Sequence, residues 1–263
     1  MRLLAIFLLT LSAPLLAQPL EPFEAEFRLH VSRIPTPIKA TLELRPTDTP
    51  DGYRMQLENR SFLVKNREES HFTWNHCQPR SQHYEHEFRG FGIRREHRMD
   101  FDWQNHEVLF DDGKDKGRYD IDDNTLDELT MLLKAQCLIA AGEKEFTLTA
   151  AYGDRVRNHT FVITGEEVID TPAGRIATIV VEKKRKADSQ RRTIFWVAPS
   201  LQNMLVKARH VENRALFGEL LMRSYKGPAP MPASPAADET DAEEQEAPAL
   251  NDDEQDEASL ALP

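Results

Sequence analysis

Apolar and polar residues alternate with a period of two along most of this chain, and that pattern restricts the fold more than any other feature. Between Phe23 and Val31, apolar residues occupy the odd positions, and charged residues or histidine occupy the even ones. Successive side chains of a strand point to opposite faces, so this segment is predicted to be a strand with one buried face. Residues 38–45 and 53–57 repeat the pattern around the turn signal Asp51-Gly52, which predicts an antiparallel meander.

The alternation continues beyond this meander. Further strands are predicted over 68–75, 81–89, 99–103, 107–110, 118–121, 146–150, 160–164, 176–181, 193–197, 205–210 and 216–225. The charged run 94–98 is placed before the strand at 99–103, and a tight turn is expected at 169–174. With this many strands, the predicted fold is mainly β: a curved antiparallel sheet or partial β-barrel with one substantial α-helix.

That helix is predicted over residues 126–140, where the period changes to that of a helix. The pair Asn124-Thr125 is expected to supply its N-cap, and Asp127-Glu128 its first turn, where the helix dipole favours negative charge. Gly142 is expected to end it. The apolar stripe of the helix is formed by Leu126, Leu129, Leu133 and Cys137. Such a helix would close one side of the curved sheet.

Residues 1–17, MRLLAIFLLTLSAPLLA, have the pattern of a secretory signal peptide. Arg2 precedes an apolar run, and the small residue Ala17 suits the position before a cleavage point. The run is shorter than the roughly 20 residues that span a bilayer, and no cysteine lies near the cleavage point to carry a lipid. We therefore expect cleavage after Ala17 and a periplasmic location, with no transmembrane segment after cleavage.

The net charge of −11 comes from one end of the chain. Residues 228–263 hold eleven acidic residues and no basic ones, so residues 1–227 are formally neutral. This balance excludes the broadly basic surface typical of nucleic-acid-binding proteins. The terminal segment is rich in Pro, Ala, Asp and Glu, and is predicted to be disordered. The expected organisation is a signal peptide (1–17), a single β-rich domain (18–227) and a disordered acidic tail (228–263).

Cys77 and Cys137 are the two cysteines of the chain. An exported compartment permits a disulfide, and Cys137 lies on the apolar side of the predicted helix. A Cys77–Cys137 disulfide would pin this helix to the predicted hairpin around residues 75–79. The alternative is a pair of buried free thiols.

Several motifs resemble one known family by their order and spacing. They are Asp102-Trp103 before a hairpin, the helix with Asp127, the turn Asp170-Thr171-Pro172-Ala173-Gly174, and Phe195-Trp196-Val197-Ala198 followed by Leu205-Val206-Lys207. The chain resembles the bacterial family called domain of unknown function 3108, from about Phe23 to Tyr225. The resemblance implies an exported, β-rich envelope protein, and it carries over no catalytic residues.

Histidine is concentrated in one part of the chain. Six of the nine histidines are His71, His76, His83, His86, His97 and His106. Strand geometry argues against a metal site, because His83 and His86 are an odd number of residues apart and point to opposite faces. Their spacing with Cys77 does not match a structural zinc signature. We expect solvated strand histidines, and no metal or other cofactor.

A hydrolytic site is the third-ranked functional hypothesis. The residue types for it are Ser61, Ser70, Ser81, His97, Asp100 and Asp102. No Gly-x-Ser-x-Gly sequence is present, nor a glycine-rich phosphate loop. Asp100 and Asp102 have the spacing of a same-face carboxylate pair, but the alternation favours the wet face for both, with Phe101 and Trp103 inside. We expect no enzymatic activity.

A basic segment is the strongest candidate for a binding surface. Its six basic residues are Lys183, Lys184, Arg185, Lys186, Arg191 and Arg192, which with Asp188 give a local charge of +5. A hairpin tip at Asp188-Ser189 would expose them at one corner. They would suit anionic lipid headgroups, lipopolysaccharide or an acidic protein. The acidic tail is a further possible partner that would compete with such anions, and a merely solvated hairpin is the alternative.

Two functions remain from the sequence. In the first, the curved sheet and its helix leave an apolar cavity for an acyl chain or another lipidic or envelope ligand. The same apolar residues are also what an ordinary core needs. In the second, an interaction or scaffolding protein of the envelope uses the basic hairpin and the acidic tail to bind a protein.

Overall fold

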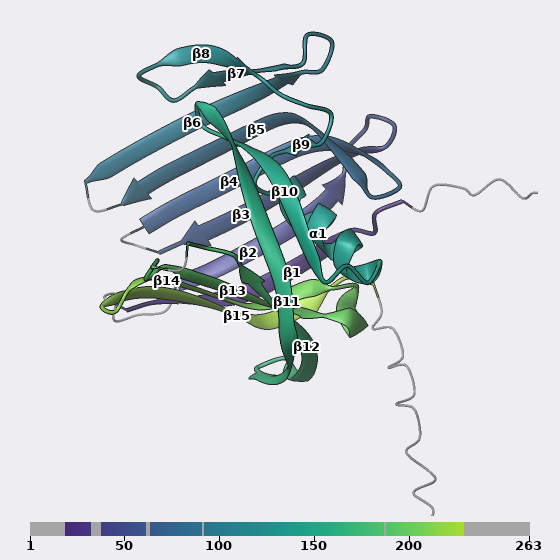
Figure 1. The fold of residues 1–263 in the computed structure, drawn as a ribbon, viewed down its shortest axis with the longest axis vertical. Coiled ribbons are helices and arrows are strands. Elements are labelled where there is room, and N and C mark those ends of the chain that lie inside the picture. Colours follow the sequence, from purple (N-terminus) through teal and green to yellow (C-terminus); the bar gives the residue numbers. More distant parts are fainter. Residues whose placement is uncertain (1–18, 33–37, 62–63, 91, 187, 229–263) are drawn as a thin grey trace, which may run out of the picture. The chain divides into compact units, whose positions relative to one another are not determined.

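The computed structural model describes residues 19–32, 38–61, 64–90, 92–186 and 188–228. The predicted signal peptide, and all of the predicted acidic tail except Pro228, lie outside the described residues. The prediction of a mainly β fold with one α-helix is confirmed, and a single antiparallel sheet dominates (Figure 1).

Fifteen strands are present in the described part of the chain. They are β1 (Phe23–Val31), β2 (Ile38–Pro46), β3 (Gly52–Arg60), β4 (Val64–Asn75), β5 (Gln78–Gly90), β6 (Ile93–Asp102), β7 (Glu107–Asp111), β8 (Lys116–Asp120), β9 (Thr125–Leu126), β10 (Glu145–Tyr152), β11 (Arg155–Thr171), β12 (Gly174–Lys183), β13 (Arg192–Ala198), β14 (Met204–Asn213) and β15 (Leu216–Lys226). The short β9 follows no alternation, which is why the sequence did not predict it.

The placement of the charged run 94–98 outside a strand is wrong, because this run belongs to β6. Its charges are tolerated there because they pair within the sheet: Arg89 and Arg94 both contact Glu96. The expected turn at 169–174 is shorter than predicted. β11 extends to Thr171 and β12 begins at Gly174, so only Pro172 and Ala173 lie between them.

The chain starts in the middle of the sheet, runs outward to one edge, and then returns from the other edge to the middle. β1 to β8 follow one another in order on one side of β1, and β15 back to β9 follow in order on its other side. β1 pairs with β15, and every neighbouring pair is antiparallel except β9 and β10. The predicted meander of β1, β2 and β3 is confirmed.

The sheet is curled. Its two edge strands are β8 and β9, and the chain runs from Asp120 to Thr125 between them. Five residue steps span at most about 18 Å, so the two edges lie close together at this point. β-Bulges, which increase the local twist, interrupt the register on both sides of β1, for example at His71/Phe72 and at Trp196/Val197. Figure 1 shows β10 and β11 crossing in front of the N-terminal half of the sheet.

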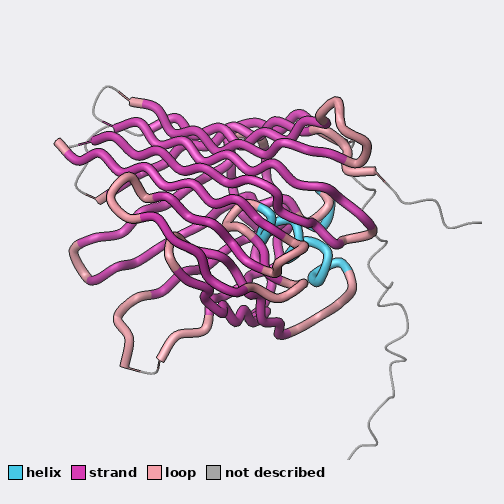
Figure 2. The backbone as a smooth tube through the Cα atoms, turned by 90° about the horizontal axis from the view of Figure 1, so that it is seen from above, coloured by secondary structure: helices cyan, strands magenta, loops and turns pink. Residues whose placement is uncertain are grey.

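The single α-helix of the described residues, α1 (Thr130–Ala140), lies within the curve of the strands (Figure 2) and contacts β5 and β10, and a short 3-10 helix, η1 (Pro199–Leu201), follows β13. It starts later than predicted: Asp127 and Glu128 precede it, and Leu126 belongs to β9. The reason is that the Asp127 carboxylate caps the helix itself, accepting the N–H groups of Leu129 and Thr130 at 2.8 Å each.

The end of α1 and its attachment follow the sequence prediction. Gly142, with a φ of 85°, ends the helix, and the next N–H, of Glu143, bonds back to the Leu138 carbonyl. The Cys77–Cys137 disulfide is present, with a Cα–Cα distance of 5.9 Å, and it joins α1 to the turn between β4 and β5. Lys134 Nζ also donates to the Cys77 carbonyl at 2.9 Å. Asn203 Nδ2 donates to the Gln136 carbonyl at 3.2 Å, so the disulfide and two polar contacts hold the helix over the sheet.

Candidate ligand-binding pocket

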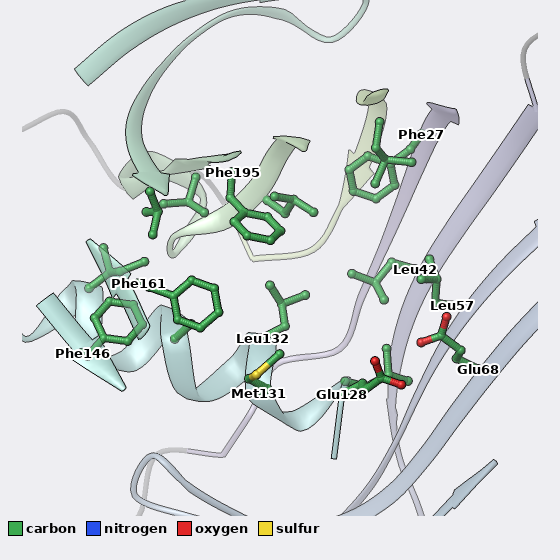
Figure 3. A pocket seen from close by; sticks show the side chains of 17 residues that line it. Phe27, Leu42, Leu57, Glu68, Glu128, Met131, Leu132, Phe146, Phe161 and Phe195 are labelled. Carbon is green, nitrogen blue, oxygen red and sulfur yellow. The ribbon is translucent and has the colours of Figure 1, made fainter. Parts of the chain in front are cut away.

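An apolar pocket of about 270 Å³ lies between α1 and the inner face of the curled sheet (Figure 3). Its apolar lining comes from both halves of the sheet and from the helix. These residues are Phe27, Leu42, Leu57, Leu129, Met131, Leu132, Ala135, Ile139, Phe146, Phe161, Val181, Phe195, Val197, Leu205 and Leu220. The alternation read from the sequence accounts for this lining, because each strand directs one set of apolar side chains inward.

Two carboxylates complete the lining of the pocket, and a tyrosine hydroxyl lies within hydrogen-bond distance of both. Glu68 comes from β4 and Glu128 from the link before α1. The buried Tyr84 hydroxyl lies 3.2 Å from Glu68 Oε2 and 3.0 Å from Glu128 Oε2. Burial, followed by the charge of Glu68, raises the pKa of Glu128 to about 7. One end of the apolar pocket therefore carries a carboxyl group that titrates near neutral pH.

A buried polar network beneath the helix fixes the position of Glu128. Asp127 is fully buried, and its carboxylate accepts hydrogen bonds from Ser70 Oγ and from the start of α1. Its own N–H donates to Ser81 Oγ at 3.2 Å and to Thr130 Oγ1 at 3.0 Å. Burial raises the pKa of Asp127 above its usual range. The network spans β4, β5 and α1, so it sets where the adjacent Glu128 enters the pocket.

The residues considered for hydrolysis are dispersed. Ser70 and Ser81 are fully buried in the network of Asp127. Asp100 lies on the exposed face, where its carboxylate contacts His83 Nδ1 at 2.7 Å. Asp102 instead accepts the backbone N–H groups of the turn that follows β6. Ser61 Oγ bonds the backbone of Val64, at the start of β4.

The histidines occupy both faces of the sheet, as the spacing of His83 and His86 predicts. His71 and His83 lie near each other, with ring centroids 6.3 Å apart. The ring centroids of His86 and His97, on neighbouring strands, are 4.9 Å apart. Burial and the neighbouring His86 lower the pKa of His97 to about 4. The two remaining histidines of the run, His76 and His106, lie in turns. Within the described ranges, no three potential metal-ligating side chains are grouped.

The basic segment divides between the two faces of the sheet. On the outer face, Lys184 pairs with Glu145 at 2.6 Å and Arg192 forms two contacts of 3.0 Å with Glu182. Arg191 pairs with Glu212, and Lys186 is exposed. Lys183 differs: it lies opposite Phe161, a pocket residue, in the register of β11 and β12. Arg185 Nη2 donates to Thr193 Oγ1 at 3.4 Å. The six residues are therefore not one uniform patch.

Sequence reasoning missed Glu68, Tyr84 and Glu128. A signal for the first was present, because the inward positions of β4 are apolar at Val64 and Phe72 but polar at Glu68 and Ser70 between them. A polar interruption on the buried face of a strand marks either a buried network or a site. Tyr84 and Glu128 carry no such local signal, since their role depends on the approach of β5 and α1.

The fold defines a β-barrel-like domain with one α-helix over the concave side of its sheet and an apolar pocket beneath that helix. The chain belongs to the family described as protein of unknown function DUF3108, whose profile matches residues 26–214. Solved structures with a similar fold include a β-barrel-like protein of domain of unknown function DUF1849 from Brucella abortus. That protein shares 10% sequence identity with this chain and a TM-score of 0.53, and the match covers 80% of this chain and 99% of that one. The likeness is one of fold.

No curated protein shows significant sequence similarity to the chain. Among the described residues, no helix has both the length and the apolar character to cross a membrane.

Proposed function

We propose that this domain is a non-enzymatic binding protein of the bacterial cell envelope whose pocket holds the aliphatic chain of a lipidic ligand. The observation that carries the proposal is the apolar pocket of about 270 Å³ beneath α1. Apolar side chains that face water across an empty pocket cost about 25 cal/mol for each Å² of apolar surface left exposed. Such a cost favours a pocket that is filled by a ligand over an imperfectly packed core.

The volume also indicates how much of a ligand enters. Pockets for small molecules hold about 300–1,000 Å³, and a cavity of about 150 Å³ accommodates benzene. This pocket lies between these sizes. It suits one aliphatic chain, and not the two chains of a bilayer lipid together. Export to the periplasm is part of the proposal, and the Cys77–Cys137 disulfide is compatible with it.

Native mass spectrometry of protein purified gently from the periplasm tests the proposal. We expect a discrete additional mass of lipid size on the folded protein and its loss on denaturation. In the variant Ala135→Phe the new ring would occupy the pocket, because Ala135 lines it from the helix. The bound fraction should fall about tenfold or more in this variant, which corresponds to at least about 1.4 kcal/mol.

Ala140→Phe is the matched control, since Ala140 is exposed at the end of the same helix. This variant should retain the wild-type bound fraction. A bare mass for the wild-type protein in repeated gentle preparations would contradict the proposal, as would equal occupancy in both variants.

A further inference from the structure

Lys183 emerges from the sheet on the side of the pocket. It is cross-strand to Phe161, and Val181, two residues earlier on β12, also lines the pocket. Residues opposite each other in an antiparallel pair share a face, so the Lys183 side chain leaves β12 next to the apolar lining. It is half-buried, and within the described ranges no carboxylate lies at ion-pair distance from it.

Arg185 lies at the same border. Its guanidinium donates to Thr193 Oγ1, and Thr193 lines a second cavity of about 260 Å³. This second cavity shares the lining residues Leu57, Phe195 and Leu220 with the first, so the two cavities are neighbours on the inner face of the sheet. Lys183 and Arg185 are therefore each next to a lining residue of these cavities, Phe161 and Thr193 respectively, whereas Lys184 and Arg192 of the same segment are paired with carboxylates on the outer face.

The charge at this border is predominantly positive. Burial, followed by the charge of Arg185, lowers the pKa of Lys183 to about 8. Burial and the charges of Lys183, Arg185 and Arg157 lower the pKa of His159 to about 4. Glu128 is the acidic group that attracts Lys183, and it holds its own proton up to near neutral pH. An anion placed here would relieve this mutual repulsion in a setting where water screens it only in part.

We propose that Lys183 and Arg185 form the head-group site of the pocket, and that the ligand is an anionic amphiphile with one aliphatic chain. Its carboxylate or phosphate would lie between these two side chains, with the chain extending beneath α1. This inference rests on the proposed function and adds to it the charge of the ligand and the direction in which it lies.

Four probes that share a twelve-carbon aliphatic chain but differ in head group test whether the pocket binds an aliphatic chain and whether the site prefers an anionic head group. The full-length protein is titrated calorimetrically with dodecanoate, dodecyl phosphate, dodecanol and dodecylammonium. We expect the two anions to bind at least about tenfold more tightly than dodecanol, and dodecylammonium to bind most weakly, because each charge-assisted contact favours an anion. The ratio of the dissociation constants for dodecanoate and dodecyl phosphate shows whether the site prefers a carboxylate or a phosphate.

A pair of double variants assigns the effect to particular residues. K183Q/R185Q should weaken dodecanoate binding about tenfold and leave dodecanol unchanged. K184Q/R192Q removes the same charge from the same segment on the outer face, and should bind dodecanoate within about twofold of wild type. If K183Q/R185Q fails to fold, the single variant Arg185→Gln carries the test, because that side chain is exposed.

The outcomes distinguish the two proposals. If none of the four probes binds the wild-type protein, the proposed function fails and the head-group site fails with it. If dodecanol or dodecylammonium binds as tightly as dodecanoate, or if both double variants weaken dodecanoate equally, the pocket stands and the head-group site is refuted.

Discussion

Glu128 is the residue whose environment differs most from that of an ordinary surface carboxylate. It borders an apolar pocket, faces the charge of Glu68, and receives a hydrogen bond from Tyr84. Burial, followed by the negative charge of Glu68, favours the protonated form of Glu128 and raises its folded-state pKa from the ordinary 4.5 to about 7, although the Tyr84 hydrogen bond acts in the opposite direction.

The raised pKa predicts how stability changes with pH. Because the folded state binds this proton more tightly than the unfolded state, the stabilisation is complete below about pH 4.5 and is lost as pH rises through about 7. Glu128→Gln removes the ionisation, so it should increase the free energy of unfolding by about 1–3 kcal/mol above about pH 8. The increase should vanish in acid, as urea denaturation over a pH series would reveal.

Glu143→Gln is the matched control, since Glu143 is exposed beyond the other end of α1. Its stability difference from wild type should not follow the same curve. A Glu128→Gln variant that is less stable than wild type at alkaline pH would show that the folded protein stabilises the carboxylate, contrary to this account.

Among the elements, α1 is the one that turns a curled sheet into a pocket, and the disulfide holds it in place. Cys77 and Cys137 are 60 residues apart in sequence. On the chain-entropy account, closing a loop of this length contributes about 4 kcal/mol to stability. The double variant C77S/C137S should lose about this much in guanidinium denaturation.

Reduction provides the control for this element. Dithiothreitol should lower the denaturation midpoint of the wild-type protein and leave that of C77S/C137S unchanged. Equal midpoints for oxidised and reduced wild type would mean that packing alone holds α1 over the sheet.

How much of these elements the sequence predicts depends on the range of the interaction that creates them. Strand β1 can be predicted from the sequence because its alternation is a local pattern. The end of α1 can be predicted as well, because Gly142 adopts the positive φ that ends a helix. The start of α1 cannot be predicted from the local sequence, because Asp127 caps the helix from within a network that includes Ser70, 57 residues away in sequence. The pocket lies beyond prediction for a related reason. Alternation indicates which face is buried, but not whether a covering helix fills the space above it.

At the scale of the whole molecule, the first and last strands of the domain, β1 and β15, lie side by side in the middle of the sheet. The edge strands, β8 and β9, come from the middle of the sequence. The pairing of β1 with β15 joins Glu24 to Lys226 in register, although 202 residues separate them. Nothing in the alternation of either strand encodes that partner. The same topology sets the basic β12–β13 segment beside the pocket, so its division into an inner and an outer set could not be foreseen from a run of like charges.

The acidic segment 228–263 gives the whole chain a charge of −11 that residues 1–227 alone lack. We expect these eleven acidic residues to compete with other anions for the basic segment. Deleting them should therefore increase binding to vesicles that contain phosphatidylglycerol, by about tenfold at low salt, since each basic residue near such a surface contributes about 1 kcal/mol. Co-sedimentation measures this directly. Salt at about 0.5 M should abolish the gain, because screening then acts within a few ångströms.

Two comparisons make this last prediction specific to the basic segment. Vesicles of phosphatidylcholine alone should bind the full and the shortened chain equally weakly, because they offer no anionic surface. Introducing K183Q/R185Q into the shortened chain should remove much of the gain, whereas K184Q/R192Q should remove less, since Lys184 and Arg192 are already paired with Glu145 and Glu182. Unchanged binding after deletion of 228–263 would mean that the acidic segment does not reach these residues, and the head-group site would then be open to its ligand at all times.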